Sequence, residues 1–369
     1  MNPIEHNRLN NFDFVRILAA SMVVFAHSFD ILTPLEQVHS NSEPLRVLTN
    51  GNMSFGSLGV AIFFCLSGYL ISQSLQFSQN YTSYFAKRFL RIFPALILDL
   101  LIAVFIWGAI VTSLPLTDYF TDSKTYLYLT NIFLFKISFF LPGVFEANIN
   151  SPVVNSSLWT LPYEFLCYVG VVILQVLLIS KNRYLYAAFG FIFFIVAIVV
   201  LNSSFSAIKF GETDITLENI FVLFTYFGAG ALFFHFKDKI PLKFSVSLVL
   251  LVIYCLSFYF GKSSIFGYLC LPYIVFWFVF APKIKLHGVS KWGDFSYGMY
   301  IYSFPVQQTI VYCFGNRMPV GKMIFLSFLF TIPLAMFSWF VIEKRALKLK
   351  NSLVAPISFE NSKESVEFA

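Results

Sequence analysis

Charge is what this 369-residue sequence has least of: only 12% of its residues are Asp, Glu, Lys or Arg, whereas 58% are hydrophobic. A soluble globular chain carries about 25% charged residues, so the composition excludes an ordinary soluble domain. The hydrophobic residues form long continuous runs, not the alternating segments of about ten residues that mark a membrane β-barrel. The sequence therefore predicts an all-α, polytopic integral membrane protein.

Several other features are also missing. The five cysteines lie in or beside apolar runs, and their spacing indicates neither a disulfide framework nor a metal site. No small-residue cleavage site follows the first apolar run, so we expect no signal peptide. No internal repeat is evident. The net charge of +6 is explained by basic loops, and nucleic acid is not an expected partner.

About ten apolar segments are long enough to span a membrane, which places both termini on one side. If the N-terminus is cytoplasmic, the inner segments hold 18 of the 25 Lys and Arg residues and the outer segments hold 7. The positive-inside rule therefore predicts cytoplasmic N- and C-termini. We expect one membrane domain over residues 1–350 and a disordered cytoplasmic tail over 351–369. The predicted spans lie near 12–32, 55–78, 91–113, 157–180, 184–202, 217–236, 242–260, 264–281, 294–313 and 322–343.

Two of the predicted outer loops are long, Leu32–Asn52 and Leu114–Ser156. The second contains a semi-apolar patch, Tyr126–Phe145. We expect this patch to form a re-entrant or interfacial helix that lines an outward-facing cavity. An eleventh span is the less favoured alternative, because it would invert every later loop against the charge bias.

The first apolar run, Asp13–Asp30, carries an arginine and a histidine on one helix. Arg16 and His27 are eleven residues apart, which places them on nearly the same face and about 16 Å apart along the axis. Ionisable residues inside a membrane usually face a protein interior or a water-filled site. The pattern favours an active site that reaches across the membrane. The alternative is an arginine at the interface and a histidine bonded between helices.

The predicted third span opens with two arginines three residues apart. Arg88 and Arg91 therefore project from one helical face, at the cytoplasmic end where Arg16 also lies. Converging guanidinium groups suit phosphate, because each binds oxygen atoms bidentately. A plain positive-inside anchor is the alternative, and Asp99 is a candidate buried partner.

Two carboxylates are candidate partners of His27. Glu164 enters the predicted fourth span from outside and reaches the same outer half as His27, while Asp30 lies one turn beyond the histidine. Either could orient the imidazole, and Glu164 could act with it as a general acid–base pair. The alternative is a purely structural role, in which Glu164 hydrogen bonds to a helix end near Pro162.

Further polar and small residues stand out inside apolar runs. Ser67 and Gly68 predict a close helix–helix contact; a nucleophilic Ser67 is the alternative, although no G-x-S-x-G elbow surrounds it. The candidates for a polar cavity or acceptor site are Trp159, Tyr297, Tyr300 and Gln307.

Six segments together resemble the acyltransferase 3 family of membrane-bound acyltransferases, in the family's order and over nearly the whole chain. Many members carry histidine two residues before the proline of the ninth-span motif, where this chain has Ser303, so no role for that histidine is carried over. The segments are Asp13-x2-Arg16-x10-His27, GVAIFFCLSGYLI at Gly59–Ile71, RFLRIFPA at Arg88–Ala95, SLWTLPYE at Ser157–Glu164, SYGMYIYSFP at Ser296–Pro305 and IEK at Ile342–Lys344.

The resemblance implies transfer of an acyl group, commonly acetyl, from cytoplasmic acyl-coenzyme A to a hydroxyl of an extracytoplasmic or lipid-linked glycan, in a bacterial inner membrane. Acyl-coenzyme A is then a co-substrate, with no permanently bound cofactor and no metal. Arg16, Arg88 and Arg91 would hold its phosphates, and His27 would deprotonate the acceptor. Glu164 would orient His27 or bind the acceptor, and an acyl-enzyme intermediate stays an alternative.

Two other classes of function compete with this one. A lipid or glycan transporter or flippase would use His27, Glu164 and Asp30 as a proton relay, and a structural membrane component would use none of them. The basic cluster on the histidine helix and the lack of matched repeats favour the enzyme.

Overall fold

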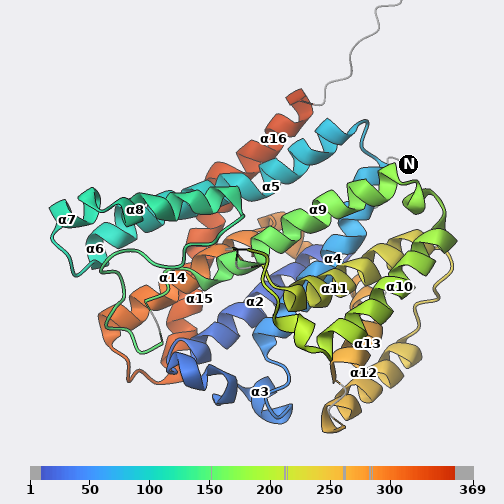
Figure 1. Ribbon diagram of the computed structural model, residues 1–369, viewed down its shortest axis with the longest axis horizontal. Helices are drawn as coiled ribbons and strands as arrows, with labels where there is room; N and C mark the ends of the chain where they lie inside the picture. Colours follow the sequence, from blue (N-terminus) through green and yellow to red (C-terminus); the bar gives the residue numbers. More distant parts are fainter. Residues whose placement is uncertain are drawn as a thin grey trace, which may run out of the picture.

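The protein is a bundle of helices in the computed structural model, which describes residues 10–150, 152–211, 213, 215–260, 263–281, 284 and 286–353 (Figure 1). Within these residues only isolated β-bridges occur and no strand is formed, which confirms the all-α prediction. All ten predicted spans coincide with helices. The long helices are α2 (Phe12–Asp30), α4 (Phe55–Gln76), α5 (Tyr81–Ile102), α9 (Leu161–Val176), α10 (Arg183–Leu201), α11 (Leu217–Phe236), α12 (Phe244–Tyr259), α13 (Ser263–Phe280), α14 (Ser296–Phe314) and α15 (Val320–Ser338).

Seven helical segments of the described chain are long and apolar enough to cross a membrane. α12 and the apolar part of α13 are shorter, and α14 is a core helix, with fourteen of its 19 residues buried. The chain is therefore a helical membrane protein, while ten crossings and the orientation of the termini stay predictions. The seven are Phe12–Asp30, Phe55–Gln76, Tyr81–Val111, Ser156–Val176, Arg183–Leu201, Leu217–Phe236 and Val320–Leu349.

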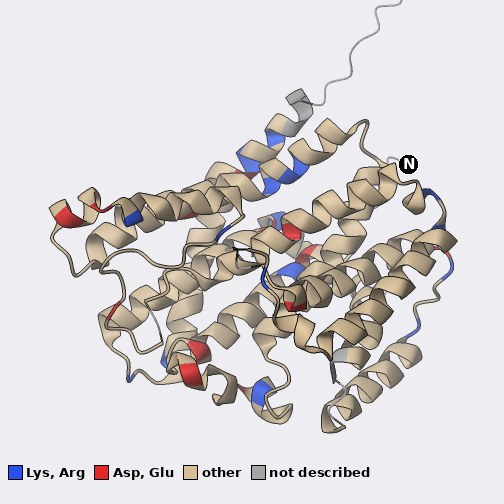
Figure 2. Ribbon diagram, in the orientation of Figure 1, with Lys and Arg blue, Asp and Glu red and all other residues tan. Residues whose placement is uncertain are grey.

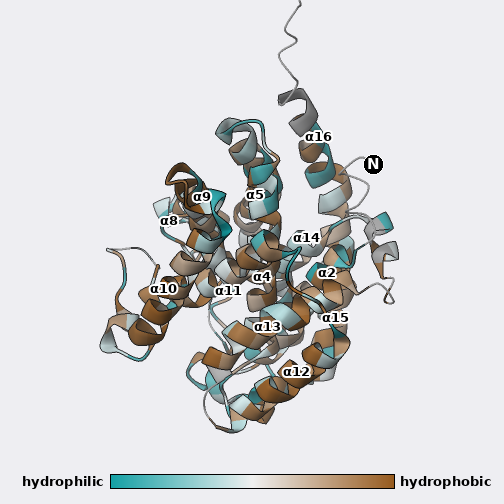
Figure 3. Cartoon of the chain, turned by 90° about the vertical axis from the view of Figure 1, so that its right-hand side faces the viewer, coloured by the Kyte–Doolittle hydropathy of each residue, from teal (hydrophilic) through white to brown (hydrophobic). Residues whose placement is uncertain are grey.

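Lipid-facing helices lie at the edge of the bundle. α10 and α12 expose branched and aromatic side chains, among them Phe191, Val199 and Val252, and both helices are largely brown in the hydropathy view (Figure 3). Apolar side chains exposed on so many turns would be unfavourable in water but suit lipid.

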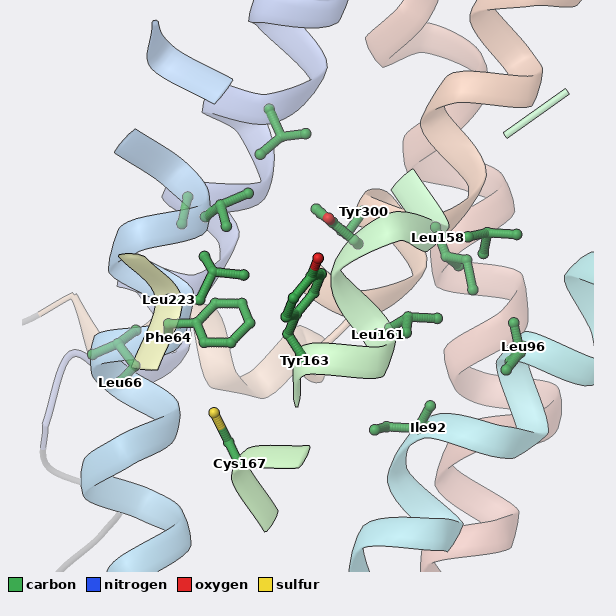
Figure 4. Close-up of a cluster of buried hydrophobic side chains, with 14 of the residues drawn as sticks. Phe64, Leu66, Ile92, Leu96, Leu158, Leu161, Tyr163, Cys167, Leu223 and Tyr300 are labelled. Atoms are coloured by element: carbon green, nitrogen blue, oxygen red, sulfur yellow. The ribbon is translucent and has the colours of Figure 1, made fainter. Parts of the chain in front are cut away.

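The centre of the bundle is α4, which packs closely on α2 and α11. A Cβ on Gly68 would lie 1.9 Å from the carbonyl oxygen of Phe227, and one on Gly230 would lie equally close to that of Cys65. Only glycine fits at both places, so the close contact predicted at Gly68 is confirmed. Figure 4 shows how the next layer is filled, with Phe64 and Leu161 among the buried side chains gathered here.

α5 begins ten residues before the predicted start at Arg91. The side chain of Asn80 accepts a hydrogen bond from the backbone N–H of Ser83 and caps the helix. The first two turns are too polar to read as a membrane span, but this N-cap makes them helical. Arg88 and Arg91 consequently lie two to three turns inside α5 rather than at its start.

The chain enters α9 from within the bundle, not from its outer surface. Asn155 is fully buried and donates to Asp99 of α5 (3.0 Å) and to the carbonyl of Ile301 on α14 (2.8 Å). The 3₁₀ stretch Ser156–Thr160 and then α9 follow directly. The loop therefore descends to the level of Asp99 before the helix starts, which moves Glu164 away from the outer half.

The two long loops form short helices. α3 (Pro44–Leu48) lies in the first; α7 (Leu116–Thr121), α8 (Ser123–Leu127) and the 3₁₀ stretch Tyr128–Phe133 lie in the second. The single re-entrant or interfacial helix expected over Tyr126–Phe145 is therefore wrong; beyond Phe133 that patch is irregular.

α2 and α14 lie side by side and run in the same direction. Arg16 bonds to Asp294, just before α14, and Gln307 near its other end bonds to Val24 and Ser28. α15 continues through a π-helical turn into α16 (Lys344–Leu353), which packs on α5. Together, α5 and α16 carry many of the Lys and Arg residues coloured blue in Figure 2. The disordered tail was predicted to start at residue 351, but α16 continues to Leu353; residues 354–369 lie outside the described chain, so their disorder stays a prediction.

Candidate active site

A cavity of about 320 Å³ opens between α2, α4, α5, α9 and α14 at the end of the bundle where α16 packs. Its basic side chains gather at one end, and its deeper part is lined by hydroxyl and aromatic groups. The polar lining residues are Arg16, Ser67, Lys87, Arg88, Arg91, Thr160, Glu164, Tyr168, Asp294, Ser296, Tyr297 and Tyr300.

Asp294 joins two of the three predicted donor-binding arginines. Its Oδ2 accepts from Nη1 of Arg16 at 2.8 Å and from Nη2 of Arg91 at 2.6 Å. Its side chain is only 12% exposed, so these are strong, well-desolvated ion pairs. Arg16 and Arg91 are therefore held in place by this carboxylate, and their charge is partly balanced.

Arg88 is in a different position. Its Nη2 lies 3.3 Å from the hydroxyl of Ser74, and its Nε is buried with no hydrogen-bond partner. No carboxylate forms an ion pair with it among the residues the structure describes. A buried, unsatisfied guanidinium N–H is costly, so Arg88 is the arginine best prepared to receive an anion.

Glu164 lies in the same cavity as the arginines. It accepts a hydrogen bond from the hydroxyl of Tyr168, one turn along α9. Deeper in, the hydroxyls of Thr160 and Tyr300 are 2.8 Å apart, and Tyr297 donates to the carbonyl of Ile92. Tyr297 and Tyr300 thus line the cavity; their part in acceptor binding stays a prediction.

His27 lies beyond the deep end of the cavity and does not line it. Its Nδ1 is buried without a hydrogen-bond partner, and its ring meets the ring of Phe304 edge-on at 5.2 Å between centroids. The cavity follows α4 inward to Val60; the neighbouring Gly59 packs against Ala19 and Val23 of α2. His27 is four residues past Val23, about 6 Å further along α2.

The structure corrects the predicted partners of His27. Asp30 accepts from Asn41 at 2.7 Å and pairs with Arg46 at 3.3 Å, while Glu164 bonds to Tyr168. Neither carboxylate hydrogen bonds to His27 within the described chain. The buried loop before α9 moves Glu164 toward the arginines, and the outer loop that carries Arg46 folds back onto Asp30.

Two other predicted cavity residues lie elsewhere. Gln307 is fully buried and donates to the carbonyl of Val24 (2.8 Å) and the hydroxyls of Ser28 (3.0 Å) and Ser327 (3.1 Å). Trp159 is half-buried beside Tyr163. Neither lines the cavity described here. Gln307 links α2, α14 and α15, and the acceptor-site roles of both residues stay predictions.

Asp294 is a site residue that was not predicted from the sequence. It is a lone acidic residue two positions before the motif Ser296–Pro305, and its spacing alone gives no sign that it meets Arg16. The ninth-span motif could have directed attention to it, because the carboxylate stands directly before a helix rich in tyrosine and serine.

The chain is similar to known proteins over nearly its whole length, including the segments that line the cavity. The model of an acyltransferase domain matches residues 9–344. The chain belongs to the acyltransferase 3 family. The O-acetyl transferase of Shigella phage Sf6 is 29% identical over 350 residues, covering 92% of this chain and 97% of the phage protein. Nodulation protein 10 of Rhizobium leguminosarum bv. viciae is also 29% identical, over 94% of this chain and 95% of its own length. No solved structure matches.

Family membership makes this chain a membrane acyltransferase. The motifs that carry it, from Arg16 through the RFLRIFPA segment to Ser296–Pro305, are the segments that build the cavity. An acyltransferase needs a donor site, a group that removes a proton from the acceptor, and a path between them. The cavity with its arginines and His27 beyond its deep end are the candidates for these parts.

Proposed function

We propose that this acyltransferase moves an acetyl group from cytoplasmic acetyl-coenzyme A to a hydroxyl of an extracytoplasmic or lipid-linked glycan, in a bacterial inner membrane. The observation that carries the proposal is the cavity, which is basic at one end and approaches the level of His27 at the other. The name of the phage relative supports acetyl as the group transferred.

The cavity suits the shape and charge of this donor. Arg88, with Lys87 beside it, would bind the pyrophosphate, while Asp294 keeps Arg16 and Arg91 in place at the same level. From Ile71 to Val60, the α4 face that lines the cavity is eleven residues long, about 16 Å. The extended pantetheine arm is of comparable length, so the thioester would reach the deep end.

In the reaction we propose, the imidazole of His27 takes the proton of the acceptor hydroxyl as its oxygen attacks the thioester carbon. The new C–O bond forms, the C–S bond breaks, and the thiolate of coenzyme A leaves and takes up the proton that His27 has received. The buried, unpartnered Nδ1 of His27 is compatible with an imidazole that exchanges a proton during turnover. Glu164, inside the cavity, would bind the acceptor or reacting groups rather than orient His27.

Surface chemistry of cells tests this proposal. Cells grown with ¹³C-acetate, with and without the protein, should differ by alkali-labile acetyl esters on a surface glycan, detected by mass spectrometry. Identical acetylation of all surface glycans and lipids in the two strains would contradict the proposed function.

A further inference from the structure

A second cavity, of about 880 Å³, adjoins the first at the same end of the bundle. The two are neighbours on α4, where Ile71 lines the first and Ser72 the second. They are also linked by Lys87, which lines the first cavity and donates to the hydroxyl of Ser78 in the second at 2.9 Å. The second cavity therefore lies beside the basic end of the first, although the two linings share no residue.

The lining of this second cavity has the chemistry of an anion site. Lys181, Arg183 and Lys237 face Asp238, three positive charges against one negative. The excess of cations over carboxylates in this lining favours an anionic ligand.

The same cavity also has room and surfaces for a flat base. Its volume lies within the range of about 300–1,000 Å³ that is usual for small-molecule sites. Tyr81 and Phe234 contribute aromatic surface, and Gln79, Asn80 and Gln175 contribute side-chain amides. Aromatic rings stack on nucleobases without regard to sequence, and amides can bond to base edges.

We propose that the second cavity binds the 3′-phosphoadenosine part of coenzyme A. This inference rests on the proposed function, because it extends the same donor outward from the pyrophosphate at Arg88. The 3′-phosphate is a monoester with a charge of about −1.5 to −2 at pH 7, which matches the excess of cations in the cavity. Donor recognition would then depend on Lys181 and Arg183 as well as on Arg88.

Binding of coenzyme A and of 3′-dephospho-coenzyme A isolates this contact, because the two differ only in that phosphate. We would measure both by calorimetry on the purified full-length protein in phosphatidylcholine nanodiscs. The wild type should bind coenzyme A about tenfold more tightly, equivalent to about 1.4 kcal/mol. The double variant K181Q/R183Q should bind the two equally. Lys239→Gln is the matched control, since Lys239 is exposed nearby, contacts Tyr184 and does not line the cavity.

Each outcome has a separate meaning. Equal binding of the two ligands by the wild type, or a preference that survives in K181Q/R183Q, would overturn this inference and leave the proposed function standing. Binding of neither ligand would refute the proposed function itself. An anionic lipid headgroup offers the same phosphate chemistry, so the measurement is repeated with phosphatidylglycerol in the nanodiscs. Loss of the preference there would assign the cavity to lipid and also overturn the inference.

Discussion

Arg88 and Arg91 are one helical turn apart and line the same cavity, yet their contacts predict different consequences when each is lost. Arg91 shares the carboxylate of Asp294 with Arg16. Arg88 has a buried Nε without a partner, and within the described residues its guanidinium hydrogen bonds to Ser74 at 3.3 Å. We therefore expect Arg88→Gln to weaken donor binding and Arg91→Gln mainly to weaken the fold.

The expected magnitudes follow from these contacts. A hydrogen bond to a charged group contributes about 1.5–3 kcal/mol, so Arg88→Gln should raise the Kd for coenzyme A by about 10- to 150-fold. Arg91→Gln breaks a 2.6 Å ion pair but leaves Asp294 bonded to Arg16 at 2.8 Å. Its cost in stability should be about 1–3 kcal/mol, below the 3–5 kcal/mol of a buried charge left wholly unpaired.

The assay combines calorimetric binding of coenzyme A with thermal unfolding of the same detergent-purified protein. Arg345→Gln serves as the control, because Arg345 is an exposed arginine on α16 that does not line the cavity. Wild-type affinity in Arg88→Gln, or equal losses of affinity in both variants with unchanged unfolding temperatures, would refute the reasoning.

Three further predictions follow from the same contacts. Asp294→Asn removes the carboxylate shared by Arg16 and Arg91, which are partly exposed, and leaves Arg16 with Asp13 at 3.6 Å. It should lower the free energy of unfolding by about 1–3 kcal/mol, measured by denaturant titration; wild-type stability would contradict a stabilising role of Asp294. Glu164→Gln should tighten binding of anionic coenzyme A, since a carboxylate leaves the cavity, while it lowers acetyl transfer; weaker binding would contradict the placement of Glu164. For topology, cysteine at Glu36 should react with an impermeant thiol reagent in whole cells and cysteine at Lys239 should not, after the exposed Cys255 and Cys313 have been replaced by alanine; the reverse pattern would invert the orientation.

The sequence was sufficient to predict the helices because lipid imposes long apolar runs, and those runs could be read directly. The predicted helix boundaries were wrong where a polar side chain extends a helix or delays its start. The Asn80 cap adds ten residues to the start of α5, and the buried Asn155 brings the chain deep into the bundle before α9 begins. Neither effect depends on hydrophobicity, so a hydropathy pattern does not contain it.

The sequence predicted which arginines gather in the candidate site, but not which carboxylates bind them. Arg16, Arg88 and Arg91 share a level of the membrane by topology, and the structure brings all three to one cavity. Which carboxylate meets which cation depends on side-chain packing between distant helices. From the sequence, Glu164 or Asp30 was predicted to be the partner of His27. In the structure Glu164 lines the cavity with the arginines, and Asp30 forms an ion pair with Arg46.

In the proposed reaction His27 accepts a proton from the acceptor while other residues hold the donor. We would test this role by transfer of ¹⁴C-acetyl from acetyl-coenzyme A to glycolipids extracted from the native membrane, comparing the purified wild-type protein with His27→Gln. Glutamine keeps hydrogen-bonding capacity but cannot take a proton at neutral pH. We expect His27→Gln to bind coenzyme A with wild-type affinity and to transfer no acetyl group. Substantial transfer by His27→Gln would rule out His27 as the base.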